Sequence, residues 1–299
     1  MKKINTLLSV LSMPIFLSSC TWIYGSIKRT EVGSSQKPAA TCDSNSDGNN
    51  YGGGSGTVAE PFLICSVNHL NKIGLNSSDW SKAFLLTSDL DLGLLPANSF
   101  NMIGTSGTRF TGVFDGGSKT ISNLSYSTTG QVLGLIAYAG AGAVVKDVSI
   151  KNFTLSTDTF AGSIVGHATG GLTATNLSAK DIDITCGSGC GGIIGYANGV
   201  TASGGGLTAT VGNRISADTD FRSNFGGFIG QAVGTNSFSN VNVNDVELNS
   251  SYRTASNVGG LAGQLEGSTL NQISVTALGI NSTSAAGGLV GSLGGTSSV

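Results

Sequence analysis

The chain has 299 residues, a formal net charge of −2 and charged side chains at only 11% of its positions. This balance excludes a basic nucleic-acid-binding surface and an acidic tail, so no nucleic-acid partner is expected. Glycine accounts for 46 residues and proline for only 4, and the aliphatic residues are strictly patterned, which predicts a folded chain with paired backbone groups and not a disordered one.

The first residues have the pattern of an export signal. Lys2 and Lys3 precede a mostly apolar stretch at 4–16 that is too short for a stable membrane anchor. It ends in Leu17-Ser18-Ser19-Cys20, which resembles the bacterial lipobox. The resemblance implies a signal peptide at 1–19, lipidation of Cys20 and, with Thr21 in place of an aspartate, a lipid anchor in the outer membrane and exposure at the cell surface. The alternative is an ordinary secretory signal with an incidental cysteine.

Residues 20–56 are rich in serine, glycine and asparagine, which predicts a flexible tether. Within it, Asp43, Asn45 and Asp47 match the opening of a calcium-binding loop. The bidentate carboxylate that such a loop needs at its twelfth position is replaced by Gly54. We therefore expect a polar tether and no bound metal or cofactor.

Four further cysteines indicate disulfide bonds, because an even number in an exported chain is typical of them. Cys186-Gly-Ser-Gly-Cys190 is short and flexible enough to close on itself, which leaves Cys42 to pair with Cys65. A redox or metal site is disfavoured, since the spacing is C-x3-C and no histidine is nearby. We expect both pairs to be structural.

Residues 57–130 are expected to form an N-terminal cap and the first coils of a repeat. Val67, Leu70 and Ile73 are three apart, which predicts a short helix that ends at Gly74 and covers a strand edge. Short strands are expected next, separated by turn residues; they lie at 83–92, 100–103, 110–114 and 120–124.

From residue 131 to residue 299 a phrase of the form Gly-Gly-x-x-Gly, with apolar x, returns at intervals of 29, 29, 35, 33 and 28 residues. Its copies lie at 161–166, 191–195, 226–230, 259–263 and 287–291, after a degenerate copy at 133–137. A period in this range predicts stacked units, none of which buries its apolar face alone. The glycines suit tight corners, where either a positive φ or close backbone approach excludes a side chain.

Between the phrases, apolar residues stand two or three apart. Two such runs are Val145, Val148, Ile150, Phe153 and Leu155, and Phe238, Val241, Val243, Val246 and Leu248. Two-residue steps place side chains on one face of a strand, and three-residue steps indicate a bend. The pattern predicts an all-β fold, a parallel β-helix or β-solenoid with a short N-terminal capping helix.

Two features depart from this regular pattern. The copy at 196–225 contains extra glycine and a polar stretch from Arg214 to Arg222, which predicts a side loop with a binding role. The sequence also stops at Val299, after a glycine phrase and without a polar capping unit. We expect that end either to self-associate with another chain or to continue in a longer repeat array.

The phrases resemble the GLUG motif of bacterial surface proteins, which include adhesins and the non-catalytic regions of IgA-type proteases. Upstream, Pro61–Cys65, Asp89–Leu92 and the long phrase Phe110–Leu124 resemble the segment that leads such arrays, so the resemblance covers about residues 60–299. It implies a right-handed parallel β-helix on a bacterial surface with an adhesion-related role, and it carries over no catalytic residue.

Enzymatic chemistry finds little support in the residues. Asp89 and Asp91 could share a strand face as a glycosidase pair, but they are expected to flank the inward Leu90 and Leu92 and cap a rung. Gly166-His167-Ala168 lacks the aspartates and basic residues of pectin-cleaving enzymes, and Asp115 precedes glycine as in a turn.

We therefore expect a non-catalytic adhesin that binds a glycan or a cell-surface protein; the alternatives are a structural envelope spacer and a polysaccharide-cleaving enzyme. Any exposed subset of four tyrosines could stack on a glycan, and these are Tyr126, Tyr138, Tyr196 and Tyr252. Other aromatic residues fall in the apolar register of the core, and these include Phe153, Phe228 and Phe238.

Overall fold

The computed structural model describes residues 42, 51–208, 212–217, 224–250, 257–283 and 285–298. The chain divides into residues 1–39 and residues 40–299, and the described residues all belong to the second unit. This unit is a β-solenoid built from parallel strands, with one short α-helix near its N-terminal side. The predicted fold class is confirmed.

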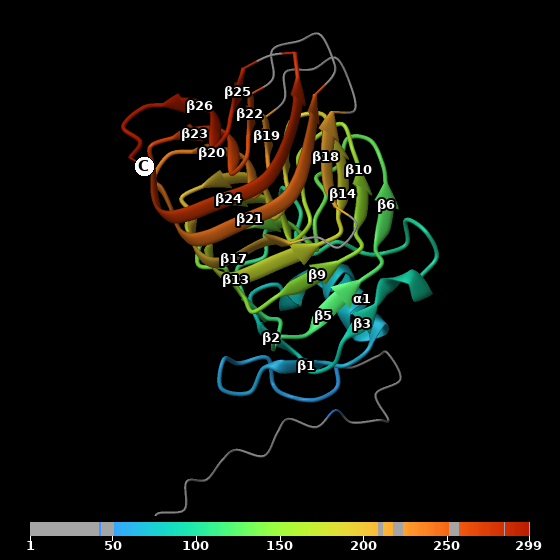
Figure 1. Cartoon of the computed structure of the whole chain (residues 1–299). Coiled ribbons are helices and arrows are strands. Elements are labelled where there is room, and N and C mark those ends of the chain that lie inside the picture. Colours follow the sequence, from blue (N-terminus) through green and yellow to red (C-terminus); the bar gives the residue numbers. More distant parts are fainter. Residues whose placement is uncertain are drawn as a thin grey trace, which may run out of the picture. The chain divides into compact units, whose positions relative to one another are not determined.

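The strands form three sheets, which Figure 1 shows as stacked rows of arrows. The first sheet has fifteen strands: β1 (Phe62–Ile64), β2 (Ala83–Leu86), β3 (Leu90–Asp91), β4 (Val113–Asp115), β5 (Thr120–Ser122), β6 (Ser125–Ser127), β8 (Val144–Lys146), β9 (Ser149–Lys151), β10 (Thr154–Ser156), β13 (Thr173–Lys180), β14 (Asp183–Cys186), β17 (Thr201–Thr208), β18 (Asn213–Ala217), β21 (Asn236–Ser250) and β24 (Ser268–Ser282). The second sheet comprises β11 (Ala161–Gly162), β15 (Gly189–Gly191), β19 (Asn224–Gly226), β22 (Asn257–Gly259) and β25 (Ala286–Gly287). The third sheet comprises β7 (Ile136–Ala139), β12 (Val165–Thr169), β16 (Ile194–Asn198), β20 (Ile229–Val233), β23 (Ala262–Glu266) and β26 (Val290–Gly294).

The glycine phrases mark the same place in every coil. In the third sheet the paired residues are Ile136, Val165, Ile194, Ile229, Ala262 and Val290, which are 29, 29, 35, 33 and 28 residues apart. These intervals are those of the phrases in the sequence. Each phrase therefore carries the chain from the second sheet into the third.

Close backbone approach, and not a positive φ, explains why the last residue of the phrase is glycine. Gly195 is not among the residues with a left-handed backbone. A Cβ atom on Gly195 would lie 2.5 Å from the carbonyl oxygen of Gly166 and 2.9 Å from the backbone of Ala161. A Cβ atom on Gly230 would likewise lie 2.5 Å from the backbone nitrogen of Cys190. The second and third sheets thus pack so closely that a side chain does not fit between them.

The inward side chains form one continuous core. Both apolar runs predicted from the sequence are buried, and Val145, Phe153 and Phe238 are each 0% exposed. On the last coil Leu270 of β24 is still buried, but four further residues are only half-buried because no described coil follows to cover them; these are Ile273, Val275, Leu278 and Ile280. Self-association at this end stays a prediction.

The N-terminal part of the solenoid begins earlier than the expected boundary at residue 57. Residues 52 and 53 pair with Leu63 of β1 through backbone hydrogen bonds of 2.8 and 2.9 Å. The Tyr51 ring lies 4.5 Å from the Phe62 ring, and a disulfide bond joins Cys42 to Cys65. The end of the expected tether therefore belongs to the folded unit and covers the edge of β1.

Helix α1 (Val67–Leu75) buries Leu70 and Ile73 in this core, as predicted. It runs one residue beyond Gly74, and Asn76 occupies its C-terminal cap, so the expected end at Gly74 is wrong. Gly74 is needed there because a Cβ atom would overlap the backbone of Asn101. Two 3-10 helices follow, η1 (Ser77–Asp79) and η2 (Leu92–Leu94). No helix in the described ranges is both long and apolar enough to span a membrane.

The expected side loop is also corrected. Residues 201–208 and 213–217 form β17 and β18 in the first sheet, where Arg214 pairs with Asp183 and Glu247 on the neighbouring strands. Residues 209–211 and 218–223, which include Arg222, lie outside the described residues. The longer interval of this copy therefore does not remove Arg214 from the solenoid wall.

Candidate functional site

A column of rings runs along the third sheet. Tyr138, His167 and Tyr196 are register partners on β7, β12 and β16, and all three are half-buried. We call these three residues the ring ladder. The same column continues as Gln231, Gln264 and Ser292 on β20, β23 and β26. The residue that follows the last position of each glycine phrase therefore forms one line across six coils.

The rings of the ladder contact one another. His167 stacks on Tyr196 with centroids 4.4 Å apart and an interplanar angle of 15°, and it lies 5.5 Å from Tyr138 at 40°. Phe160, just before β11, packs against His167 and Tyr196 in T-shaped geometry, with ring centroids 5.6 and 5.3 Å apart. Because the faces of the rings meet within the ladder, a ligand would mainly contact ring edges and hydroxyl groups.

Arg109 contacts the ring ladder at its Tyr138 end. Its guanidinium lies 5.9 Å from the centre of the Tyr138 ring and donates a hydrogen bond to the hydroxyl of Thr169. Burial, and then the positive charge of Arg109, lower the pKa of His167 to about 4. His167 is therefore neutral near pH 7, and its Nδ1 is a covered atom with no hydrogen-bond partner among the described residues.

The polar end of the column is a chain of side-chain amides. Gln231 Nε2 donates to Gln264 Oε1 at 3.1 Å, and Gln264 Nε2 donates to Glu266 Oε1 at 3.1 Å. Within the described ranges, no hydrogen bond is made by the hydroxyls of Tyr138 and Tyr196. The column thus offers donors, acceptors and apolar ring edges at one position per coil, about 4.8 Å apart.

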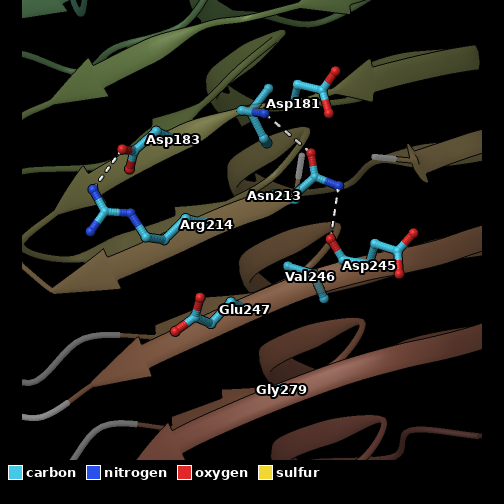
Figure 2. Close-up of a pocket in the computed structure, with 10 residues that line it drawn as sticks. Asp181, Asp183, Asn213, Arg214, Asp245, Val246, Glu247 and Gly279 are labelled. Atoms are coloured by element: carbon cyan, nitrogen blue, oxygen red, sulfur yellow. Dashed lines mark hydrogen bonds and ion pairs between the residues drawn. The ribbon is translucent and has the colours of Figure 1, made fainter. Parts of the chain in front are cut away.

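A second feature is an open depression of about 630 Å³ where the first sheet turns a corner. Figure 2 shows Asp183, Arg214 and Glu247 on successive strands to one side of Asn213, and the carboxylates of Asp181 and Asp245 to the other. Arg214 forms an ion pair with Asp183 at 2.6 Å, and this carboxylate raises the pKa of Arg214. The depression is acidic on balance.

Asn213 explains the shape of this corner. It is buried in the inward column and accepts a hydrogen bond from the backbone nitrogen of Ile182 at 3.2 Å. It also donates to the carbonyl oxygens of Thr208 and Asp245 at 2.9 and 3.2 Å. The amide thus satisfies backbone groups that the corner leaves unpaired. No group of three or more metal-ligating side chains is present in the part of the chain that the structure describes.

The carboxylates weighed as catalytic residues have structural partners. Asp89 accepts a hydrogen bond from the backbone of Thr120 at 2.7 Å, and Asp91 accepts one from Gly93 at 2.9 Å. Asp115 accepts one from Gly117 at 2.8 Å and pairs with Lys146 at 2.5 Å, which raises the pKa of Lys146. Leu90 and Leu92, which alternate with the first two aspartates, are buried, so their predicted inward orientation is confirmed.

The structure also describes the predicted disulfide bonds and core aromatic residues. Both expected disulfide bonds are present, with Cα atoms 6.3 Å apart for Cys42–Cys65 and 5.7 Å apart for Cys186–Cys190. The expected core aromatics are buried, and these are Phe153, Phe228 and Phe238. The lipidation residue, the calcium-loop residues and one tyrosine lie outside the described residues, and these are Cys20, Asp43, Asn45, Asp47 and Tyr252.

Sequence reasoning named Tyr138 and Tyr196 but missed Phe160, Arg109 and the two glutamines. It also set His167 aside as an incomplete enzyme motif. One signal was available, because the ladder and its continuation all occupy the position directly after the glycine phrase. The contribution of Arg109, by contrast, depends on a contact between segments 60 residues apart.

Comparisons with known proteins add one partial similarity. No protein-family profile matches the chain, and no solved structure matches it. A stretch of 116 residues, 36% of the chain, is 33% identical to halomucin from Haloquadratum walsbyi. That stretch spans 1% of the length of halomucin. The resemblance to GLUG repeats therefore stays a prediction from the residues.

Proposed function

We propose that this protein is a surface-exposed lipoprotein of the bacterial outer membrane that binds glycans through a non-catalytic β-solenoid. The observation that carries the proposal is the ring ladder with its amide continuation, Tyr138, His167, Tyr196, Gln231 and Gln264 in one register column. Such a column presents one aromatic or amide side chain per coil at a regular spacing, which suits a ligand that is itself a repeating polymer.

The chemistry of the column favours sugars over other polymers. Sugar rings present hydroxyl groups around an apolar C–H face, and the column combines tyrosine hydroxyls, amides and aromatic edges. Tyrosine has an apolar body and a polar end, so it contacts both parts of such a ligand. The neutral His167 and the low charge of the chain favour a ligand without strong charge.

A binding role without catalysis is supported by the carboxylates. Asp89, Asp91 and Asp115 accept hydrogen bonds from backbone groups, and Asp183 pairs with Arg214. A glycosidase needs two carboxyl groups that face each other across the scissile bond, one of them free to transfer a proton. These four carboxylates are engaged with the backbone or with Arg214, which supports a role that does not include proton transfer by these groups.

Exposure at the surface is supported by the lipobox-like sequence at Cys20 and by two disulfide bonds, which persist outside the reducing cytosol. Lipidation would fix the anchor stably, because three acyl chains exceed the two signals needed for stable attachment.

The anchor is tested by Cys20→Ser in the full-length protein expressed in a bacterium with two membranes. We expect the variant to lose fatty-acid labelling and to leave the outer-membrane fraction, because serine lacks the sulfur that carries the lipid. Cys186→Ser is the control, since it removes a cysteine that should carry no lipid and should keep the label. Labelling that persists in Cys20→Ser would contradict the lipoprotein assignment.

Glycan binding is tested with the purified full-length protein in detergent micelles on a broad glycan and polysaccharide array, with released sugar measured in the same wells. We expect saturable retention without sugar release. The double substitution His167→Ala/Tyr196→Ala should weaken retention about ten-fold, because it removes two adjacent ligand contacts.

The matched control is Thr175→Ala/Ser203→Ala, which changes two outward register partners of the first sheet in the same two coils and should have no effect. Sugar release would overturn the non-catalytic assignment. Equal retention by both double variants would exclude the ring ladder as the binding surface. No retention at all would favour a protein ligand or a structural spacer.

A further inference from the structure

A groove opens beside the Tyr138 end of the ring ladder. It has a volume of about 360 Å³, and its lining includes Asn101, Ser106, Tyr126, Gln131 and Tyr138. Tyr138 therefore belongs both to the ladder and to the groove wall. We call this feature the Tyr126 groove.

Because of the position of Tyr126, the groove reaches the hydrophobic core. Tyr126 lies on β6 at the edge of the first sheet and pairs with Leu155, whose side chain is buried in the core. Tyr126 is itself half-buried and packs against the core cluster. The groove thus extends inward to a residue of the core column, where a ring is accessible from the outside.

The lining is polar but uncharged. None of the residues that line the groove carries an ionisable acidic or basic group apart from the two tyrosine phenols. Across the described ranges, no hydrogen bond is made by the side chains of Ser106, Gln131 or Tyr126. Asn101 Nδ2 donates to Asn71 at 3.0 Å, which fixes the orientation of the Asn101 amide. The groove therefore offers unused hydrogen-bonding groups beside two aromatic rings.

From this lining we propose that the Tyr126 groove binds the terminal sugar of a neutral glycan, whose following units lie along the ring ladder. The inference rests on the proposed function and adds the end of the ligand and its charge class. Aromatic rings and hydroxyl or amide groups together match the C–H faces and hydroxyls of a sugar. No lining residue is a cation, and the nearby Arg109 guanidinium already contacts the Tyr138 ring and the Thr169 hydroxyl, which favours a neutral sugar over a carboxylated one. The volume falls in the range of small-molecule sites.

The test is saturation-transfer NMR on the full-length protein in micelles. The probes are the methyl glycosides of glucose, galactose, mannose and N-acetylglucosamine, with glucuronic acid and N-acetylneuraminic acid as acidic counterparts. We expect at least one neutral glycoside to bind and both acidic sugars to bind more weakly. Tyr126→Phe should weaken binding of that glycoside about five-fold, because it removes one hydrogen-bonding hydroxyl and keeps the ring.

A blocking variant locates the site. Ser106 is exposed at the groove, so Ser106→Trp should fill the opening and abolish binding of the neutral glycoside without unfolding the protein. Thr201→Trp adds the same bulk at an exposed position of β17 in the first sheet and should leave binding unchanged. Far-UV circular dichroism of both variants confirms that each is folded.

The outcomes separate the groove from the proposed function. If Ser106→Trp binds the neutral glycoside as well as the wild type does, or if an acidic sugar binds best, the groove inference is overturned. Array binding that remains sensitive to His167→Ala/Tyr196→Ala would then leave the proposed function standing. If no probe binds and the array is also silent, both are overturned.

Discussion

Replacing Gly195 with alanine is expected to lower the free energy of unfolding by about 3 kcal/mol or more, since overpacking a tightly filled contact typically costs 1–3 kcal/mol and here the obstacle is backbone. The new Cβ atom would lie 2.5 Å from the carbonyl oxygen of Gly166 and 2.9 Å from the backbone of Ala161. Neither of these atoms moves without breaking the pairing of a neighbouring coil. The variant should therefore unfold at a much lower denaturant concentration than the wild type.

Gly107 provides the matched control for this substitution. A Cβ atom at Gly107 would meet no atom within 4 Å, and the residue is not in the left-handed region. Gly107→Ala should therefore change the free energy of unfolding by less than about 1 kcal/mol, through the unfolded chain alone. Urea unfolding followed by far-UV circular dichroism measures both variants. Equal midpoints for the two would mean that the sheets are not packed as closely as described.

The sequence predicts the architecture well because the spacing of the repeated phrase specifies which residues of successive coils pair. The intervals between glycine phrases equal the intervals between paired residues of the third sheet. Apolar residues spaced by two, such as Val241 and Val243, likewise predict which side chains face inward. Both signals can be read directly from the sequence, without knowledge of which side chains meet when the coils stack.

What the sequence does not predict depends on contacts between coils. The choice between a positive φ and close backbone approach as the reason for the phrase glycines depends on the distance between two sheets, which no single repeat reveals. Arg214 was expected on a loop because its copy contains extra glycine and a polar stretch, yet it lies in β18 opposite Asp183. The Tyr126 groove also depends on segments from separate coils, since residues 101 and 131 meet only when the coils stack.

The residues at the corners between strands were also not predicted from the sequence. Asp147, Asn152, Asn176 and Asp181 adopt positive φ values of 52–54° at corners of the first sheet. Asparagine and aspartate tolerate this conformation better than other side chains, and several also bond along the stack, as Asn176 Nδ2 does to Asp147 Oδ1 at 2.9 Å. In the sequence they look like ordinary surface residues between apolar ones.

The substitution Val243→Asp is expected to lower the free energy of unfolding by about 4 kcal/mol, because it removes a buried aliphatic group and places a carboxylate without a partner in the core. Val243 is 1% exposed and lies between Leu207 of β17 and Val275 of β24 in the inward column. The loss of one inward residue should weaken the stacking of the coils on both sides.

Asn242→Asp adds the same carboxylate one residue away, on the exposed face of β21, and should change the free energy of unfolding by less than about 0.5 kcal/mol. Burial raises the pKa of an unpaired carboxyl group, so the folded Val243→Asp protein should bind a proton more readily than the unfolded chain does. The difference between the two variants should therefore narrow as the pH falls from 7 to 4. Thermal unfolding across this pH range measures it. Equal melting temperatures at pH 7 would mean that Val243 faces outward and that the inward column is misassigned.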